Sequence, residues 1–148
     1  MNEYDLDIFR LANQGYCCSQ IVMQLGLDIQ GKENPGLIRA LSALCHGFPE
    51  NRGVCGALSG AGCLLAYYAG KGSPDCEENK RLPLMLSEIA QWFDNHCTQH
   101  SHGILCQEIV PDGKPDTVLC GSLLSACYGQ AMTILVENGF DPLGGHDN

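Results

Sequence analysis

The chain has 148 residues, ten of them cysteine, and a formal net charge of -9 at pH 7. This length predicts a single domain, residues 1–148, that can bury a core without disulfide bonds. Eight Lys and Arg residues against 17 acidic residues make nucleic acid and anionic membrane surfaces poor partners. The N-terminal residues do not have the basic start and apolar run of a secretory signal, so we expect a cytoplasmic protein with mostly reduced thiols.

Apolar periodicity and helix-ending residues predict an all-α fold, a bundle of about five to six helices. Gly15 and Gly26 are expected to close the first two helices, and Pro35 to start the third. The expected helices cover residues 5–13, 17–25, 35 to about 47, about 54–69, about 78–98 and about 117–137, with a short element of unclear type over 103–110.

The helix expected over about 54–69 is rich in small residues. Gly56 and Gly60, like Ala57 and Ala61, recur four residues apart, which leaves a groove where another helix backbone can approach closely. The surrounding uncharged stretch, residues 53–70, reaches the lower limit for a membrane span, but its many Gly and Ala residues favour a buried helix. We therefore expect this helix to be the hub of the bundle, with no membrane segment.

Cys55 lies at the start of this central helix, after a turn-like stretch. Unpaired backbone N–H groups and the positive end of the helix dipole favour a thiolate there, so we expect a lowered thiol pKa. Arg52, three residues earlier, is expected to lower that pKa further. Cys63, two turns deeper, is expected to be a buried core residue. Cys55 is therefore the leading candidate for a reactive thiol.

Three segments resemble the small redox-active family named for a C…GCAxxG…C…C cysteine pattern, and the resemblance spans nearly the whole chain. The central motif is Cys55-Gly56-Ala57-Leu58-Ser59-Gly60, with the cysteine one place earlier than in the family name. The segments that carry the resemblance are Gly15-Tyr16-Cys17-Cys18-Ser19-Gln20, the central motif and Gly103-Ile104-Leu105-Cys106-Gln107-Glu108-Ile109.

The resemblance implies redox activity in a broad sense, with no settled substrate. Its register indicates Cys18 as the first family cysteine, with Cys17 an extra neighbour, and Cys106 as the third. The fourth is Cys120 or Cys127, of which Cys120 is favoured by its distance from the chain end. The stretch before the central motif has fewer glycines than is common in the family, so a ligand held there in relatives could be bound differently or not at all.

These four cysteines allow two kinds of chemistry. Adjacent cysteines rarely pair with each other, so Cys18 is expected to pair with a distant cysteine such as Cys55. Cys106 and Cys120 then supply a second pair, or all four thiols converge. Four converging thiolates also suit zinc or an iron–sulfur cluster, although the sequence contains no Cys-x-x-Cys pair.

Other cysteines and histidines are weaker candidates. His96 and His100 are four residues apart with Cys97 between them, a spacing that suits a metal ion but also a polar helix end. Cys45 with its neighbouring histidine is a similar case. Cys76 lies between two acidic residues in a loop, so its pKa is expected to be raised and its thiol inert.

Three functional hypotheses follow. The first is a thiol oxidoreductase in which Cys55 is the nucleophile, Cys18 resolves the mixed disulfide, and Cys106 and Cys120 form a supporting pair. The second is an electron carrier with metal or an iron–sulfur cluster on the same four cysteines. The third is a non-catalytic helical protein whose cysteines fill the core. The expected partner is a redox protein or a small thiol, and an exposed apolar helix face could form a homodimer.

Overall fold

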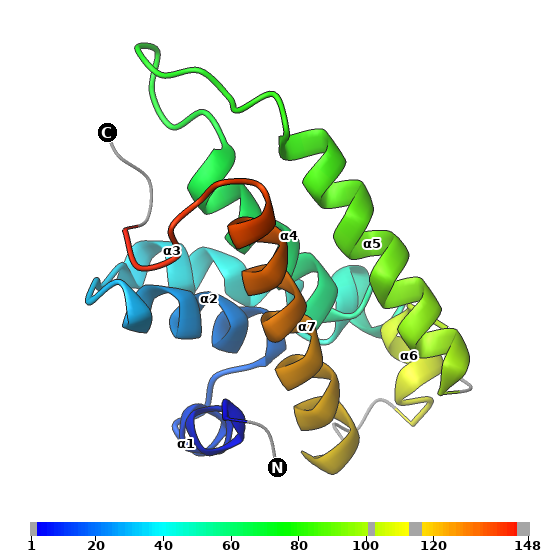
Figure 1. Ribbon diagram of the computed structural model, residues 1–148. Coiled ribbons are helices and arrows are strands. Elements are labelled where there is room, and N and C mark those ends of the chain that lie inside the picture. Colours follow the sequence, from blue (N-terminus) through cyan, green and yellow to red (C-terminus); the bar gives the residue numbers. More distant parts are fainter. Residues whose placement is uncertain (1–2, 101–102, 113–116, 145–148) are drawn as a thin grey trace.

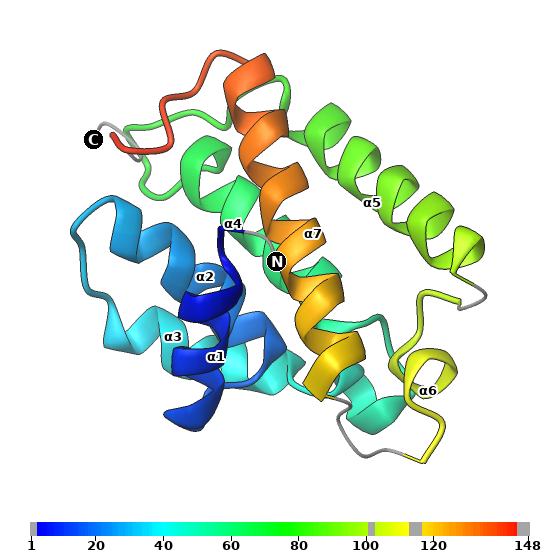
Figure 2. The same ribbon diagram turned by 60° about the horizontal axis from the view of Figure 1, so that its bottom comes forward.

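The computed structural model describes residues 3–100, 103–112 and 117–144. Within these ranges the chain forms seven α-helices and a single isolated β-bridge, which confirms the predicted all-α class. Helices α1 and α5 flank α7 on opposite sides (Figures 1 and 2). The helices are α1 (Asp5–Asn13), α2 (Cys18–Ile29), α3 (Pro35–Leu41), α4 (Gly56–Ala69), α5 (Leu82–Gln99), α6 (Cys106–Ile109) and α7 (Thr117–Glu137), with a 3-10 turn η1 (Ser42–Leu44) and a π-helical turn η2 (Gly47–Asn51).

Local capping explains the end of α1 and the starts of α2 and α3. The chain leaves α1 through Gly15, whose φ of 94° is a conformation that glycine adopts without strain. The backbone N–H of Cys17, just before α2, donates to Gln20 Oε1 at 3.2 Å. The Asn34 side chain caps α3, which begins with Pro35. These boundaries therefore follow from signals that are visible in the sequence.

Helix α4 forms the centre of the core and contacts α2, α5 and α7. Its Leu64 and Leu65 side chains are fully buried. On the face toward α2, a Cβ atom at Gly60 would lie only 2.8 Å from the Cα atom of Ser19. The small-residue groove and the hub position predicted for this helix are both confirmed.

Three predicted boundaries are wrong. Helix α3 ends at Leu41, where the 3-10 turn η1 begins, and does not continue to about residue 47. Helix α2 does not end at Gly26 but continues to Ile29, because the missing side chain at Gly26 makes room for Leu64 of α4. Tertiary packing here overrides the weak helix propensity of glycine. Helix α5 begins at Leu82 instead of about residue 78, and Pro83 occupies its first turn.

Helix α7 contains the one stretch in the described ranges that is long and apolar enough to cross a membrane, Val118–Glu137, with a mean hydropathy of 1.5. This helix packs against α1, α2, α4 and α5, and its Ile134 and Leu135 side chains are fully buried. A core helix of a bundle has the same composition, so this stretch alone assigns no membrane span.

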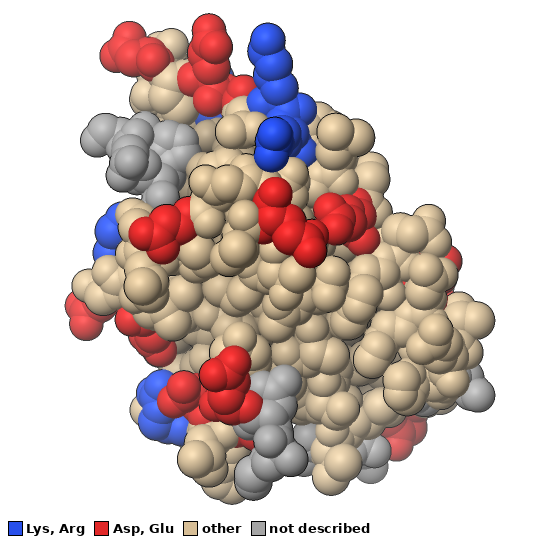
Figure 3. Space-filling model, in the orientation of Figure 1, with Lys and Arg blue, Asp and Glu red and all other residues tan. Residues whose placement is uncertain are grey.

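Charged side chains are sparse on the face shown in Figure 3. Acidic groups outnumber Lys and Arg there, in keeping with the net charge of -9, and a broad uncharged area lies between them. Scattered charges of this kind are typical of a solvated surface.

Cys17 and Cys45 form a disulfide, which the sequence analysis did not predict. Their Cα atoms lie 5.7 Å apart, and 28 residues separate them along the chain. The bond joins the start of α2 to the residue after η1, where Cys45 cannot serve the metal site considered for it. Cys17 is therefore disulfide-bonded to Cys45 and is more than an extra cysteine beside Cys18.

Replacing both residues of this disulfide by serine is expected to lower stability. A cross-link over 28 residues removes enough unfolded-state entropy to stabilise the fold by about 3.5 kcal/mol. Serine at position 17 keeps a side chain that can cap α2, so the loss should reflect the bond itself. Urea unfolding of Cys17→Ser/Cys45→Ser without reductant should show the lower midpoint. Equal midpoints for the variant and the oxidised wild type would contradict this assignment.

Candidate functional site

Four thiols converge where several helices begin. Cys18 is the first residue of α2, Cys106 is the first residue of α6, and Cys55 immediately precedes α4. Cys120 lies in the first turn of α7. These are the four cysteines that the family resemblance indicated, and they come from widely separated parts of the chain.

The β-bridge holds two of these cysteines side by side. Val54 pairs with Leu105 in an antiparallel bridge. The Cys55 N–H donates to the Ile104 carbonyl at 2.9 Å, and the Cys106 N–H donates to the Gly53 carbonyl at 2.9 Å. Backbone hydrogen bonds therefore fix the starts of α4 and α6 against each other and place Cys55 near Cys106.

The close packing of α2 on α4 positions Cys18. A Cβ atom at Gly56 would lie 3.3 Å from Cys18 Cβ, so glycine at this position lets the two helix starts approach closely. The buried Ser19 hydroxyl donates to the Leu41 carbonyl at 2.8 Å and ties the same turn to α3. In the central motif the cysteine precedes the glycine. Cys55 therefore lies just before α4, and Gly56 lies where α4 contacts α2.

Each of the four thiols interacts electrostatically with the other three. A hydrogen bond between Cys18 and Cys120, together with burial, raises the pKa of Cys18 far above the ordinary thiol value. Burial and the neighbouring Cys120 also raise the pKa of Cys106. We call Cys18, Cys55, Cys106 and Cys120 the cysteine cluster.

The expected lowering of the Cys55 pKa is wrong. The backbone N–H groups of Ala57 and Leu58 do favour the thiolate, as a helix start should. Burial outweighs them, because Cys55 is only 8% exposed, and raises its pKa to about 11. Arg52 is exposed on the surface. Cys55 is therefore a protonated, shielded thiol at neutral pH.

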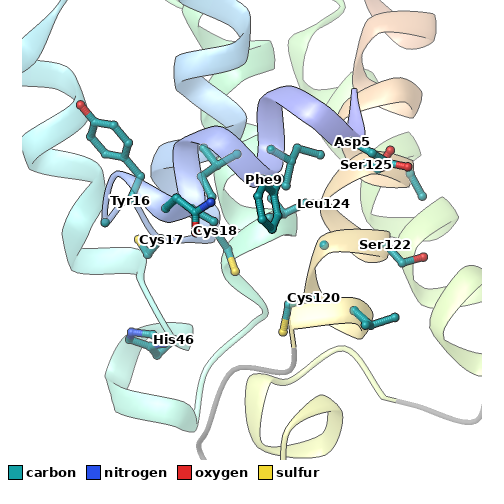
Figure 4. Close-up of a pocket in the computed structure, with 18 residues that line it drawn as sticks. Asp5, Phe9, Tyr16, Cys17, Cys18, His46, Cys120, Ser122, Leu124 and Ser125 are labelled. Carbon is teal, nitrogen blue, oxygen red and sulfur yellow. The ribbon is translucent and has the colours of Figure 1, made fainter. Parts of the chain in front are cut away.

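A pocket of about 840 Å³ opens beside the cluster, between α1, the start of α2 and α7. Cys18 and Cys120 line it, and their sulfur atoms face the same space from two helices (Figure 4). Its described lining does not include Cys55 or Cys106. A small molecule in this pocket would thus meet the pair of Cys18 and Cys120 first.

Cys76 also differs from the expectation. The Gly72 N–H donates to Cys76 Sγ at 3.2 Å, and this bond, with that from the Ser73 N–H, lowers the pKa of Cys76. The nearby Lys71 lowers it further. The two acidic sequence neighbours therefore do not set its ionisation, and the surface loop gives the chain an acidic thiol.

The pH dependence of alkylation should separate Cys76 from Cys55. Because its pKa is lowered, Cys76 forms its thiolate at a lower pH than an ordinary thiol does. The rate of its reaction with iodoacetamide should therefore reach half its maximum at a pH below the pKa of an ordinary thiol. Cys55 should react slowly until the pH approaches about 11. Mass spectrometry of peptides labelled at several pH values measures both rates. Equal rates for the two peptides at neutral pH would contradict this assignment, and unfolded protein is the control.

The proposed histidine site is not assembled as a metal centre in the described part of the chain. The His96 ring stacks on Trp92, and its centroid lies 4.5 Å from that of His100. His100 Nδ1 is 2.8 Å from the His96 carbonyl oxygen, which is an ordinary helix-end contact. Cys97 points into the core, fully buried, and burial raises its pKa to about 11. The two histidines share a face, but Cys97 does not join them.

No group of three or more His, Cys, Asp or Glu side chains is placed to hold a metal ion among the described residues. The cysteine cluster is not such a group, although its thiols interact electrostatically and Cys18 is hydrogen-bonded to Cys120. Cys127, the alternative fourth cysteine, lies deeper, where its thiol donates to the Ala57 carbonyl at 3.4 Å. Cys63 is half-buried on α4, and burial raises its pKa.

These features define a class: an all-α protein in which four thiols from separate helix starts meet beside a pocket. The chain belongs to the C_GCAxxG_C_C family, whose model, described as "Putative redox-active protein (C_GCAxxG_C_C)", matches residues 16–134. The resemblance drawn from the sequence is thereby confirmed, and the match includes the whole cysteine cluster. No curated protein and no solved structure compared with the chain gave a match.

Proposed function

We propose that the cysteine cluster is a two-electron dithiol/disulfide centre in which Cys18 and Cys120 are the pair that reacts with the electron acceptor. The hydrogen bond between these two thiols carries the proposal, because sulfur atoms in such contact can join with little movement of the helices. The pocket supports it, since both thiols line a space large enough for a small molecule.

The hydrogen bond assigns different roles to the two thiols. In this proposal we assign the proton of the singly ionised pair to Cys18, the thiol whose pKa is raised, which leaves the negative charge on Cys120. Cys120 is then the nucleophile that attacks a disulfide acceptor, forming a mixed disulfide and releasing the first thiolate. Cys18 next loses its proton and attacks Cys120 Sγ, which releases the second thiol and leaves a Cys18–Cys120 disulfide.

Cys55 and Cys106 form the inner pair in this proposal. The β-bridge holds them together behind the pocket, and burial keeps their thiols protonated at neutral pH. As neutral thiols they add no charge beside Cys18 and Cys120. The sequence hypothesis made Cys55 the nucleophile. Here Cys120 takes that role, because the pocket opens on Cys18 and Cys120 and not on Cys55.

A zinc ion or an iron–sulfur cluster bound by Cys18, Cys55, Cys106 and Cys120 is the second candidate function. The observation that favours it is the convergence of four potential thiolates at the starts of α2, α4 and α7, where the helix dipoles would stabilise an anionic thiolate site. The spacing within the cluster weighs against it, since no three of the described side chains are placed to hold a metal ion. Metal and acid-labile sulfide analysis of anaerobically purified protein distinguishes the two.

A redox titration tests the proposal. Protein equilibrated anaerobically with mixtures of reduced and oxidised dithiothreitol, and at higher potentials with mixtures of reduced and oxidised glutathione, should lose two trapped thiols, at Cys18 and Cys120, in one reversible two-electron step. The Cys17–Cys45 disulfide is removed beforehand by serine substitution so that it adds no second transition. A protein whose cluster thiols stay reduced across the titration would overturn the proposal. If that protein also contained stoichiometric metal, the cluster would be assigned as a zinc or iron–sulfur site.

A further inference from the structure

The pocket beside the cysteine cluster has an apolar wall. Ile8 and Phe9 of α1 and Leu124 of α7 line it, and Figure 4 shows Phe9 beside Leu124. Its volume of about 840 Å³ is that of a small-molecule site. Phe9 is 61% exposed and Val118 is 82% exposed, although both line the pocket. Large apolar side chains left open beside reactive thiols favour a ligand with an apolar body.

The side-chain charges of the described pocket lining favour a neutral ligand over an anionic one. The described lining contains no Lys or Arg, and its ionisable groups other than thiols at neutral pH are Asp5 and His46. A phosphate or carboxylate would meet the Asp5 carboxylate without a Lys or Arg partner among these described lining residues. Nucleotide cofactors and glutathione are therefore disfavoured, and the ligand is expected to be neutral.

A single orphaned hydroxyl gives the pocket a specific polar group. Ser125 of α7 lines the pocket and is only 3% exposed, and its Oγ has no hydrogen-bond partner in the described structure. A buried hydroxyl without a partner is destabilising, so its presence in a native structure calls for an explanation. The Oγ atom is itself buried, so the Ser125 side chain would rotate about χ1 to donate a hydrogen bond to a ligand carbonyl in the pocket.

We propose that this pocket binds a neutral quinone, the oxidant of the Cys18–Cys120 pair; this inference rests on the proposed function. The quinone ring packs against Phe9 and Leu124, and one carbonyl oxygen accepts a hydrogen bond from Ser125. In the reaction each thiol loses its proton and the S–S bond forms between the two sulfur atoms. Two electrons and two protons pass to the quinone, whose two carbonyl groups become the two hydroxyls of the quinol.

Duroquinone tests this inference because its ring is fully substituted and cannot add thiols. Reduced protein mixed with duroquinone without oxygen should form one quinol per chain and lose the thiols of Cys18 and Cys120 together. Gly121 lines the pocket with open space at its Cβ position, so Gly121→Leu should fill the pocket and slow the reaction at least about tenfold. Gly129→Ala on the same helix, outside the pocket lining, is the matched control and should react like wild type.

Ser125→Ala provides a second readout. Loss of one neutral hydrogen bond should raise the half-saturating duroquinone concentration about 3- to 10-fold. The urea midpoint should not fall, because the change removes a hydroxyl that has no partner. A lower midpoint together with unchanged duroquinone dependence would assign Ser125 a structural role and contradict this part of the inference.

Two outcomes separate this inference from the function on which it rests. A pair that cycles with dithiothreitol but does not reduce duroquinone, or reduces it equally fast in Gly121→Leu, overturns the quinone site alone. A pair that cycles with neither reagent overturns the proposed function as well.

Discussion

Replacing Cys120 with serine is expected to abolish the reversible two-electron couple of the protein. The Cys18 thiol would lose the sulfur atom to which it is hydrogen-bonded, so no disulfide could close over the pocket. The substitution is nearly isosteric at a half-buried position, so stability should change by about 1 kcal/mol or less. Thiol trapping after equilibration with oxidised dithiothreitol should show no loss of cluster thiols in Cys120→Ser, and the same in Cys18→Ser.

Cys63→Ser is the matched control for these variants. Like Cys18 and Cys120, Cys63 is a half-buried thiol on a helix, but it lies on α4 outside the cluster. Its replacement should leave the couple intact. If Cys120→Ser kept the couple and Cys55→Ser lost it, the inner pair would be the redox pair, and the roles proposed here would be reversed.

Replacing Gly60 with alanine is expected to have the largest effect on stability among single methyl additions in the central helix. The added Cβ would lie 2.8 Å from Ser19 Cα and 3.0 Å from its carbonyl oxygen, and these backbone atoms cannot rotate away. Overpacking of this kind costs about 1–3 kcal/mol. Separation of α2 from α4 would also move Cys18 away from Cys55 and admit water between them, so the pKa values of these two thiols should fall toward ordinary thiol values.

Gly62→Ala is the control on the same helix. Its Cβ would lie 3.6 Å from Leu86 Cδ2, an ordinary contact, and alanine is favoured over glycine inside a helix by up to about 1 kcal/mol. Urea unfolding should therefore give Gly60→Ala a lower midpoint than wild type and Gly62→Ala an equal or higher one. Equal midpoints for the two variants would contradict the close packing of α2 on α4.

Much of the fold could be predicted from the sequence because its boundaries are local. The predicted bounds of α1 and α7 match the structure, since Gly15 follows the first helix and Asn138-Gly139 follows the last. The continuation of α2 through Gly26 could not be predicted, because it depends on Leu64 of another helix. The Cys17–Cys45 disulfide likewise depends on how the turn after α3 folds back, which no sequence spacing encodes.

The proximity of the candidate cysteines could be predicted from the sequence, but their ionisation could not. The family pattern indicated Cys18, Cys55 and Cys106, with Cys120 favoured over Cys127 as the fourth, and the structure brings these four thiols near one another. Burial then reversed the expected pKa shift of Cys55. For Cys76 the expected pKa was too high. The loop N–H groups that point at its sulfur lower its pKa more than the acidic sequence neighbours raise it. The directions of both pKa shifts depend on solvent exposure and on the positions of backbone N–H groups, which only the folded chain defines. The cytoplasmic location and the partner protein stay predictions.

The most direct test of the central claim is mass-spectrometric mapping of disulfide-linked peptides in anaerobically purified protein. Cys17→Ser/Cys45→Ser is the protein to use, because it removes the adjacent disulfide that would obscure linkages at Cys18. We predict a Cys18–Cys120 linked peptide that appears with oxidised dithiothreitol or oxidised glutathione and disappears with the reduced form. Cluster thiols that resist alkylation and remain unlinked, in protein that retains stoichiometric zinc or iron with sulfide, would contradict it.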